Sequence, residues 1–305
     1  ANIRGDEQTP SASVMKVFTA AAALETMSTQ YTATTRVFTL PEQPGVIVLR
    51  GGGDHTLSRL NSPRYTTYKK PARLSTLAAQ VLAALPAEQA ITKIILDDTY
   101  FDKPFWNDAW RTSDRTNGYI SHITALQVDS DRANPDLTSR AYSGVRSRDP
   151  VMAAGTHFKK ALGARAASAT LEVAVTPDHA ILAASVQSQP MSVWLDHALK
   201  YSDNTETEMI ARHALRINRM ETTFKNIQPL MVRVMNAYGV DASKLVMADG
   251  SGLAQSNRVT ARMTAELLAK SADPASVLHP MIGYLPVSGI SGTLATRFNG
   301  DNRSA

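Results

Sequence analysis

The chain contains no cysteine among its 305 residues. Disulfide bonds, thiolate nucleophiles and cysteine-bound metal ions are therefore excluded, while a cysteine-free chain is compatible with a reducing or an oxidising compartment. The sequence also lacks an apolar run of about 18 residues, so it predicts no membrane-spanning helix. A glycine-rich loop ending in lysine is absent too, which argues against a P-loop nucleotide site.

Histidine and clustered charge are scarce as well. None of the seven histidines has a partner four positions away, the spacing that brings two imidazoles to one helix face. We therefore expect no histidine-based metal site and no cofactor. The net charge of +5 is dispersed and is not interleaved with aromatic residues. This pattern argues against nucleic-acid binding and supports at most a weak preference for an anionic polymer.

The most informative stretch begins at Ser11 and is rich in alanine, leucine and methionine, which favours a helix with Ser11 or Ser13 as its cap. Ser13 and Lys16 would share one face of this helix. A serine becomes a nucleophile when a nearby base accepts its proton, and a desolvated lysine can be that base. The alternative is a capped surface helix, because Ser-x-x-Lys occurs by chance about once in a chain of this length.

Two later segments could complete such a site. Ser202-Asp203-Asn204 lies between two predicted helices, where a hydroxyl and a carboxamide could face the same pocket. The same three residues would also serve as an ordinary helix cap. The glycines of Asp249-Gly250-Ser251-Gly252-Leu253 indicate a tight turn that closely approaches another segment.

The secondary-structure pattern predicts an α+β protein. Residues 28–183 alternate strand-like runs with helices, including an expected hairpin of 169–175 with 180–186, whereas the chain is helical from residue 191 onward. We therefore predict an α-rich core, 1–27 with 184–305, interrupted by a mixed domain at 28–183. The polar segment 130–148 is expected to be an exposed loop. The predicted helices are 74–85, 150–162, 191–200, 205–216, 226–239 and 260–270.

Taken in order, the three motifs resemble those of the class C low-molecular-mass penicillin-binding proteins, the D-alanyl-D-alanine carboxypeptidases/endopeptidases of peptidase family S13. The resemblance extends to Gly51-Gly52-Gly53-Asp54-His55-Thr56-Leu57, to Ala125-Leu126-Gln127-Val128-Asp129 and to the segment 285–294. It implies a serine β-lactamase/DD-peptidase-like core with an inserted domain. It also implies a serine peptidase that acts on D-Ala-D-Ala or cross-linked peptidoglycan stem peptides and is acylated by β-lactams.

The resemblance also implies a role for each matched residue. Ser13 would be the nucleophile, Lys16 its base, Ser202 the group that passes a proton to the leaving amine, and Asn204 a holder of the substrate amide. In the inserted domain, Asp114 and Tyr119 would line a pocket for the peptide side chain. An acidic residue there suits the free ammonium of a diamino acid.

Two further expectations follow from the resemblance. Ser251 and Leu253 would contribute to the same substrate pocket, Leu253 as an apolar wall. The family works on the cell wall, which implies an extracytoplasmic location, periplasmic or on the outer cell-wall side, after removal of a signal peptide.

The sequence departs from the family pattern in three ways. Its third motif, Lys-Thr-Gly, does not occur. Only 12 residues precede Ser13, where the family has a helix and strands, and the loop 130–148 stands where familiar members have a third domain. We therefore expect a partial sequence in which the central antiparallel sheet is incomplete.

Two other functions remain open. A class A-like β-lactamase shares the first two motifs, but it places them much closer together than 202 − 13 = 189 residues and needs a deacylating glutamate loop that we do not find. The other is a non-catalytic peptidoglycan-binding protein that has lost the third motif.

Overall fold

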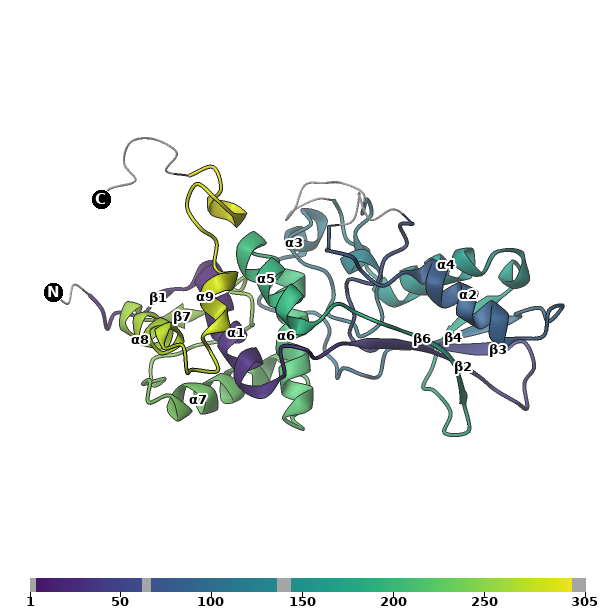
Figure 1. Cartoon of the computed structure of the whole chain (residues 1–305), viewed down its shortest axis with the longest axis horizontal. Coiled ribbons are helices and arrows are strands. Elements are labelled where there is room, and N and C mark those ends of the chain that lie inside the picture. Colours follow the sequence, from purple (N-terminus) through teal and green to yellow (C-terminus); the bar gives the residue numbers. More distant parts are fainter. Residues whose placement is uncertain (1–3, 62–66, 136–143, 298–305) are drawn as a thin grey trace. The chain divides into compact units, whose positions relative to one another are not determined.

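The computed structural model describes residues 4–61, 67–135 and 144–297 (Figure 1). The chain forms two compact units: unit 1 contains Ala1–Tyr31, Trp106–Arg111 and Met191–Ala305, and unit 2 contains Thr32–Phe105 and Thr112–Pro190. The domain limits predicted from the sequence, at residues 27/28 and 183/184, stay a prediction. The sequence pattern gave no indication that 106–111 belongs with unit 1.

Unit 1 is mainly helical, and α1 (Met15–Thr26) lies at its centre. Every residue of α1 from Met15 to Leu24 is buried, and α1 packs against helices α5, α6, α7 and α9. A run of alanines suits this position because small side chains let helices approach from several sides. The other helices of unit 1 are α5 (Met191–Tyr201), α6 (Asn204–Ile217), α7 (Ile227–Ala237), α8 (Ala261–Ala272) and α9 (Pro280–Tyr284).

Unit 1 contains few β-strand residues in its described part. They form one two-stranded antiparallel sheet, in which β1 (Thr9–Pro10) pairs with β7 (Arg258–Val259). The pairing ties the segment before α1 to the segment before α8. The expectation that the central sheet is incomplete in this chain stays a prediction.

The start of α1 differs from the prediction. The chain enters through a 3-10 turn, Ala12–Val14, and neither Ser11 nor Val14 at the two N-cap positions makes a side-chain capping bond. The Ser11 hydroxyl is buried and has no hydrogen-bond partner in the described part of the chain, so the predicted serine cap is wrong. Because Ser13 lies inside this turn, its hydroxyl stays available for other contacts.

Unit 2 contains a five-stranded mixed sheet in the order β5-β4-β3-β2-β6. Strand β2 is antiparallel to β3 and β6, whereas β3, β4 and β5 run parallel. Helices α2 (Leu74–Ala84) and α4 (Pro150–Leu162) pack together on one face of this sheet (Figure 1). The strands are β2 (Thr34–Thr39), β3 (Val46–Arg50), β4 (Lys93–Asp97), β5 (Thr170–Val173) and β6 (Ile181–Gln187).

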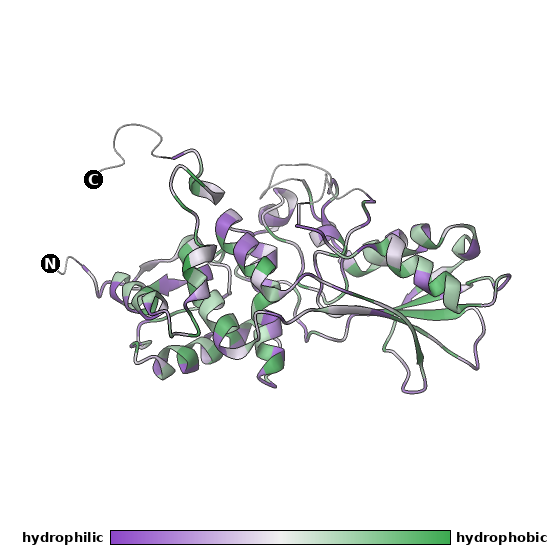
Figure 2. Ribbon diagram, in the orientation of Figure 1, coloured by the Kyte–Doolittle hydropathy of each residue, from purple (hydrophilic) through white to green (hydrophobic). Residues whose placement is uncertain are grey.

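The core of unit 2 lies between this sheet and its two helices. Ile47, Leu49, Ile94 and Leu96 are fully buried against residues of α2 and α4, and Figure 2 shows the hydrophobic colouring of these strands. The predicted helices, in both units, have ends within about two residues of the observed ones. Apolar periodicity was therefore a reliable guide to the helices.

The predicted hairpin of 169–175 with 180–186 is wrong. Both strands exist, but β5 pairs with β4 at one edge of the sheet and β6 pairs with β2 at the other. The connection between them covers the second face of the sheet, where Ala174 and Ala180 pack against Leu40, Val48 and Ile95. Burial of this apolar face prevails over the local turn signal.

The predicted exposed loop 130–148 is exposed only in part among its described residues: Ala133, Asn134, Val145 and Arg148 are exposed, and others are not. Ser130 and Arg132 are buried, as is Arg146. Arg146 donates to the carbonyls of Ser130 (2.9 Å) and Gly118 (3.0 Å), so its charge is solvated by backbone instead of water. Residues 136–143 lie outside the described residues.

None of the helices in the described part of the chain has the length and apolar character needed to cross a membrane.

Candidate active site

Lys16 is the centre of a buried polar cluster in unit 1. It lies in the first turn of α1 and is only 2% exposed. Its Nζ atom lies 3.3 Å from Ser13 Oγ, 2.6 Å from Asn204 Oδ1 and 2.7 Å from the carbonyl oxygen of Ser251. The three segments chosen from the sequence therefore meet at one ammonium group.

The contacts of Lys16 define the direction of its lone pair. A neutral amine has two N–H bonds, and the two closest acceptors, on Asn204 and Ser251, would take both. The lone pair is then directed toward the third neighbour, Ser13 Oγ, as a general base requires. Burial lowers the pKa of Lys16 to about 8, against the raising influence of Asp249, Glu208 and Asp203. Neutral lysine is consequently accessible near physiological pH.

Ser202 provides a second hydroxyl at the nucleophile. Its Oγ donates to Ser13 Oγ at 2.7 Å, and it occupies the turn between α5 and α6. Its φ of 58° is unusual for a residue other than glycine, and such strain concentrates at functional sites. The cap of α6 is Asp203, whose side chain accepts from Glu206 N at 3.0 Å. The motif thus serves both purposes considered above: Asp203 caps the helix, and its two neighbours face Ser13 and Lys16.

The loop that presents the Ser251 carbonyl is fixed by buried carboxylates. Glu208, one turn after Asn204 on α6, accepts from Ser251 N at 2.7 Å and from Gly250 N at 3.1 Å. Asp249 accepts from Gly252 N at 2.8 Å, the N–H of the same peptide group whose carbonyl faces Lys16. This peptide is held at both ends, so the acceptor for Lys16 is preorganised.

Asp249 also joins this loop to its surroundings. Its second carboxylate oxygen accepts from Ala254 N and from Trp110 Nε1, both at 2.7 Å, and its first also accepts from Asn257 Nδ2 at 2.8 Å. Trp110 belongs to the short segment 106–111 of unit 1. An indole donor from a distant part of the sequence therefore helps to fix the loop.

Gly252 is required by the close approach of the loop to the start of α1. Its φ is +83°, and a Cβ there would lie 1.8 Å from the Ala12 carbonyl oxygen. The backbone of Ala12, just before Ser13, and the backbone of the loop 249–253 are thus in direct contact. This is the close approach that the glycines of the motif predicted.

The sequence motifs did not identify Glu208 as a residue of the site. Glu208 is fully buried, and burial followed by the charge of Asp249 raises its pKa to about 8. A usable signal existed, because residues four apart share a helix face and Glu208 follows Asn204 by that interval. Thr19, one turn after Lys16, was missed in the same way; its hydroxyl donates to the Gly250 carbonyl at 2.6 Å.

The predicted substrate-pocket residues divide between the two units. Leu253 is half-buried in unit 1, and Ser251 has a buried side chain, with its carbonyl directed at Lys16. Asp114 and Tyr119 belong to unit 2, where Tyr119 N donates to the Asp114 carbonyl at 2.8 Å and Tyr119 is 38% exposed. Their role in a substrate pocket stays a prediction.

One cluster of possible metal ligands occurs in the described residues. Atoms of His197, Asp203 and Glu206 lie within 4.8 Å of one another, and all three residues are buried. His197 Nδ1 lies 2.5 Å from a Glu206 carboxylate oxygen, and Asp203 caps the helix that carries Glu206. Hydrogen bonds between α5 and α6 account for this arrangement, and the expectation of no metal site stays a prediction.

Together, an exposed serine, a buried lysine of lowered pKa and a second serine have the arrangement that serine acyl transfer requires, on an α+β scaffold. A model of the D-Ala-D-Ala carboxypeptidase 3 (S13) family matches residues 1–144 and 140–305. The chain belongs to this family. The family match confirms the resemblance drawn from the motifs and replaces the class A β-lactamase interpretation.

Relatives and solved structures agree with this assignment. The chain is 33% identical over 288 residues to carboxypeptidase DacB of Mycolicibacterium smegmatis and 34% identical over 290 residues to a carboxypeptidase of Mycobacterium tuberculosis. Each alignment covers 94% of this chain and 61% of the relative, so the chain spans less than two thirds of their length. The fold is similar to that of penicillin-binding protein 4 from Haemophilus influenzae, with a TM-score of 0.77 at 18% identity, over 97% of this chain and 77% of that one. The predicted fold class is confirmed.

Proposed function

We propose that this chain carries the nucleophilic centre of a serine DD-peptidase that cleaves D-Ala-D-Ala or cross-linked stem peptides of peptidoglycan. The observation that carries the proposal is the triple contact of Lys16 with Ser13, Asn204 and Ser251. Family membership supports the substrate class, as does a relative from Actinomadura named D-alanyl-D-alanine carboxypeptidase, 26% identical over 380 residues.

Acylation would begin with proton transfer from Ser13 Oγ to the neutral amine of Lys16. The Ser13 oxygen attacks the carbonyl carbon of the scissile peptide, and the carbonyl becomes an oxyanion. The backbone N–H of Ser13 is one candidate donor to this oxyanion, and a single such donor is typically worth about 10²–10³ in rate. The family resemblance attributes the second donor to the segment after a Lys-Thr-Gly motif, and this motif does not occur in the sequence.

Collapse of the tetrahedral intermediate breaks the C–N bond. The leaving amine needs a proton, and Ser202, at 2.7 Å from Ser13 Oγ, can relay it from the Lys16 ammonium. The product is an acyl ester on Ser13. Water then hydrolyses the ester with Lys16 again accepting a proton, which returns the serine and completes the cycle.

The same centre would react with β-lactams, since their strained amide presents an equivalent carbonyl to Ser13. A solved neighbour, penicillin-binding protein 4 from Haemophilus influenzae, is described in complex with a novel β-lactam. In this proposal Asn204 holds the substrate amide and Leu253 offers an apolar surface to the substrate, both in unit 1, and Asp114 and Tyr119 of unit 2 contribute to binding the stem-peptide side chain. An extracytoplasmic location, periplasmic or at the outer cell wall, follows from the substrate.

The test is release of D-alanine from a synthetic stem peptide ending in D-Ala-D-Ala. We expect the purified protein to release it and the Ser13→Ala variant to release none above the uncatalysed rate. Unchanged release by Ser13→Ala would overturn the assignment. Failure of the unmodified protein to release D-alanine or to react with penicillin would instead support the non-catalytic peptidoglycan-binding alternative.

A further inference from the structure

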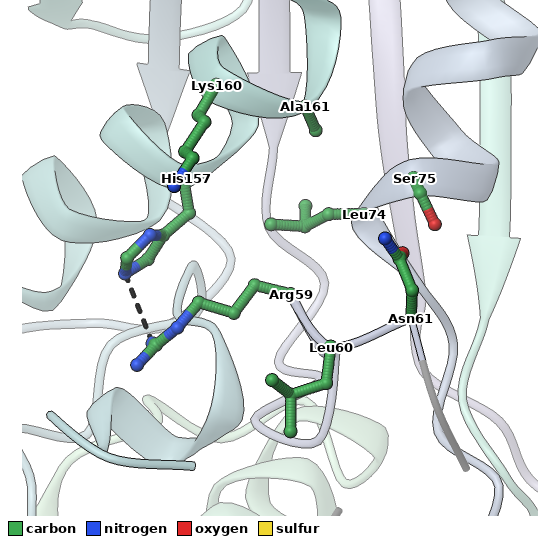
Figure 3. A pocket seen from close by; sticks show the side chains of 8 residues that line it. All are labelled: Arg59, Leu60, Asn61, Leu74, Ser75, His157, Lys160 and Ala161. Carbon is green, nitrogen blue, oxygen red and sulfur yellow. Dashed lines mark hydrogen bonds between the residues drawn. The ribbon is translucent and has the colours of Figure 1, made fainter. Parts of the chain in front are cut away.

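A pocket with a volume of about 510 Å³ lies entirely within unit 2 (Figure 3). Its size is within the usual range for small-molecule sites, roughly 300–1,000 Å³. It is formed by residues 59–61, by the start of α2 and by the second half of α4. The lining residues are Arg59, Leu60, Asn61, Leu74, Ser75, His157, Lys160 and Ala161.

The side chains of this lining that carry a formal charge are all positive. The lining includes Arg59 and Lys160 and contains neither aspartate nor glutamate. Arg59 is held in place, since it donates to the carbonyls of Arg132 and Ala133 at 2.9 Å each and lies 3.6 Å from the buried Asp129 carboxylate. Asp129 balances the charge of Arg59, so Lys160 adds one positive charge that no acid in the lining offsets.

The hydrogen bond and the pKa of His157 are consistent with these positive charges nearby. The Nε2 atom of His157 lies 3.1 Å from Arg59 Nη1, and because a guanidinium can only donate, the imidazole must accept there (Figure 3). His157 is therefore neutral, and its hydrogen is on Nδ1, where it can be donated. Burial, followed by the charges of Arg59 and Lys160, lowers the pKa of His157 to about 4.

Three side chains of the pocket carry hydrogen-bond donors that have no partner among the described residues. The side chains of Asn61, Ser75 and Lys160 make no hydrogen bond to any described residue, and Lys160 is exposed. The N-cap of α2, Arg73, makes no side-chain capping bond, so the first turn that carries Ser75 has no side-chain cap. Donors from three segments thus line one cavity.

We propose that this pocket binds the oxyanion group, phosphate or carboxylate, of a small organic molecule. Lys160 and the His157 Nδ1–H would contact the anion, while Arg59 holds His157 in the tautomer that carries its hydrogen on Nδ1. Leu60, Leu74 and Ala161 form an apolar wall for the body that carries the anion. The proposal stands on unit 2 alone and does not depend on the peptidase activity.

The test compares four small ligands at constant ionic strength: glucose 6-phosphate, gluconate, glucose and inorganic phosphate. Binding is followed by NMR of the purified protein, with the His157 ring resonance as probe. We expect the sugar phosphate, the sugar carboxylate or both to bind more tightly than glucose. The two sugar anions together identify which oxyanion is preferred. A bound anion should also raise the pKa of His157 from about 4, since it stabilises the imidazolium.

A matched pair of variants separates the pocket from general charge. Lys160→Met should weaken anion binding about 10-fold or more, since a charge-assisted hydrogen bond is lost. Lys159→Met removes the same charge one residue away, from a lysine whose Nζ donates to the Ala169 carbonyl at 2.6 Å, and should leave affinity within about 2-fold. Equal losses in both variants, equal binding of glucose and the sugar anions, or binding that leaves the His157 pKa unchanged would each overturn the proposal.

Discussion

Asn204 Oδ1 lies 2.6 Å from Lys16 Nζ, although the two residues are 188 positions apart in the sequence. This hydrogen bond connects α6 to the first turn of α1 and fixes the lysine beside Ser13. Because the amide oxygen takes one N–H of the amine, it also helps to set the direction of the lone pair. The catalytic proposal therefore depends on a relationship between two helices more than on the Ser-x-x-Lys spacing alone.

The lowered pKa of Lys16 predicts how acylation depends on pH. The base is active when neutral, so the second-order rate of Ser13 acylation by penicillin should rise with pH, with an apparent pKa of about 8, and level off above it. The Ser202→Ala variant should keep this rise, because Lys16 remains. A rate independent of pH between about 6 and 10 would show that Lys16 is not the base.

Glu208→Gln should impair acylation without unfolding the protein. Above the Glu208 pKa of about 8, each oxygen of the ionised carboxylate accepts from one backbone N–H group, that of Gly250 or Ser251, whereas glutamine offers one acceptor. Loss of one buried hydrogen bond, about 1–3 kcal/mol, predicts a decrease of roughly 10- to 100-fold in the acylation rate. The control is Glu221→Gln, an exposed residue paired with Lys225, which should have no effect on the rate. An unchanged rate in Glu208→Gln would remove Glu208 from the account.

Gly252→Ala should abolish acylation because a methyl group would overlap the Ala12 carbonyl oxygen. Gly239→Ala is the matched control: its φ of +67° is also left-handed, but no atom lies within 4 Å of the added methyl group. The control isolates the backbone cost, about 1–2 kcal/mol in the free energy of unfolding, and should acylate normally. If both variants lost the same stability and both acylated, the close approach would have no role in the site.

Asp114→Asn tests the proposed substrate pocket. If the carboxylate binds a side-chain ammonium, the variant should lose about 10- to 100-fold in kcat/KM on stem peptides with a free diamino-acid side chain, as expected for a contact worth about 1–3 kcal/mol. Simple acyl-D-Ala-D-Ala substrates and penicillin should react nearly as before. Equal losses on both substrate types would assign Asp114 a structural role.

Much of the candidate site could be predicted from the sequence because its groups occur in short contiguous motifs. Ser13 with Lys16, and Ser202 with Asn204, are close enough in sequence for helix geometry to relate them. Glu208 and Thr19 support the site through their hydrogen bonds to the loop 249–253. A contact between segments tens of residues apart is only weakly indicated by a single sequence.

In the fold, too, the features set by neighbouring residues were predicted, and those set by contacts between distant segments were not. Helices were predicted well because apolar periodicity is local, as in α4 (Pro150–Leu162). The partners of β5 and β6 were not, because strand pairing depends on which apolar face the connection must cover. The buried Arg146 was misjudged for a related reason, since its acceptors Ser130 and Gly118 lie 16 and 28 positions away in the sequence.

The most direct test of the central claim is the intact mass of the protein after incubation with a penicillin, followed by mapping of the modified peptide. The account predicts one covalent adduct on Ser13, no adduct in Ser13→Ala, and labelling slowed by several orders of magnitude in Lys16→Ala through loss of the base. An adduct that persists in Ser13→Ala, or that maps to another residue, would contradict it.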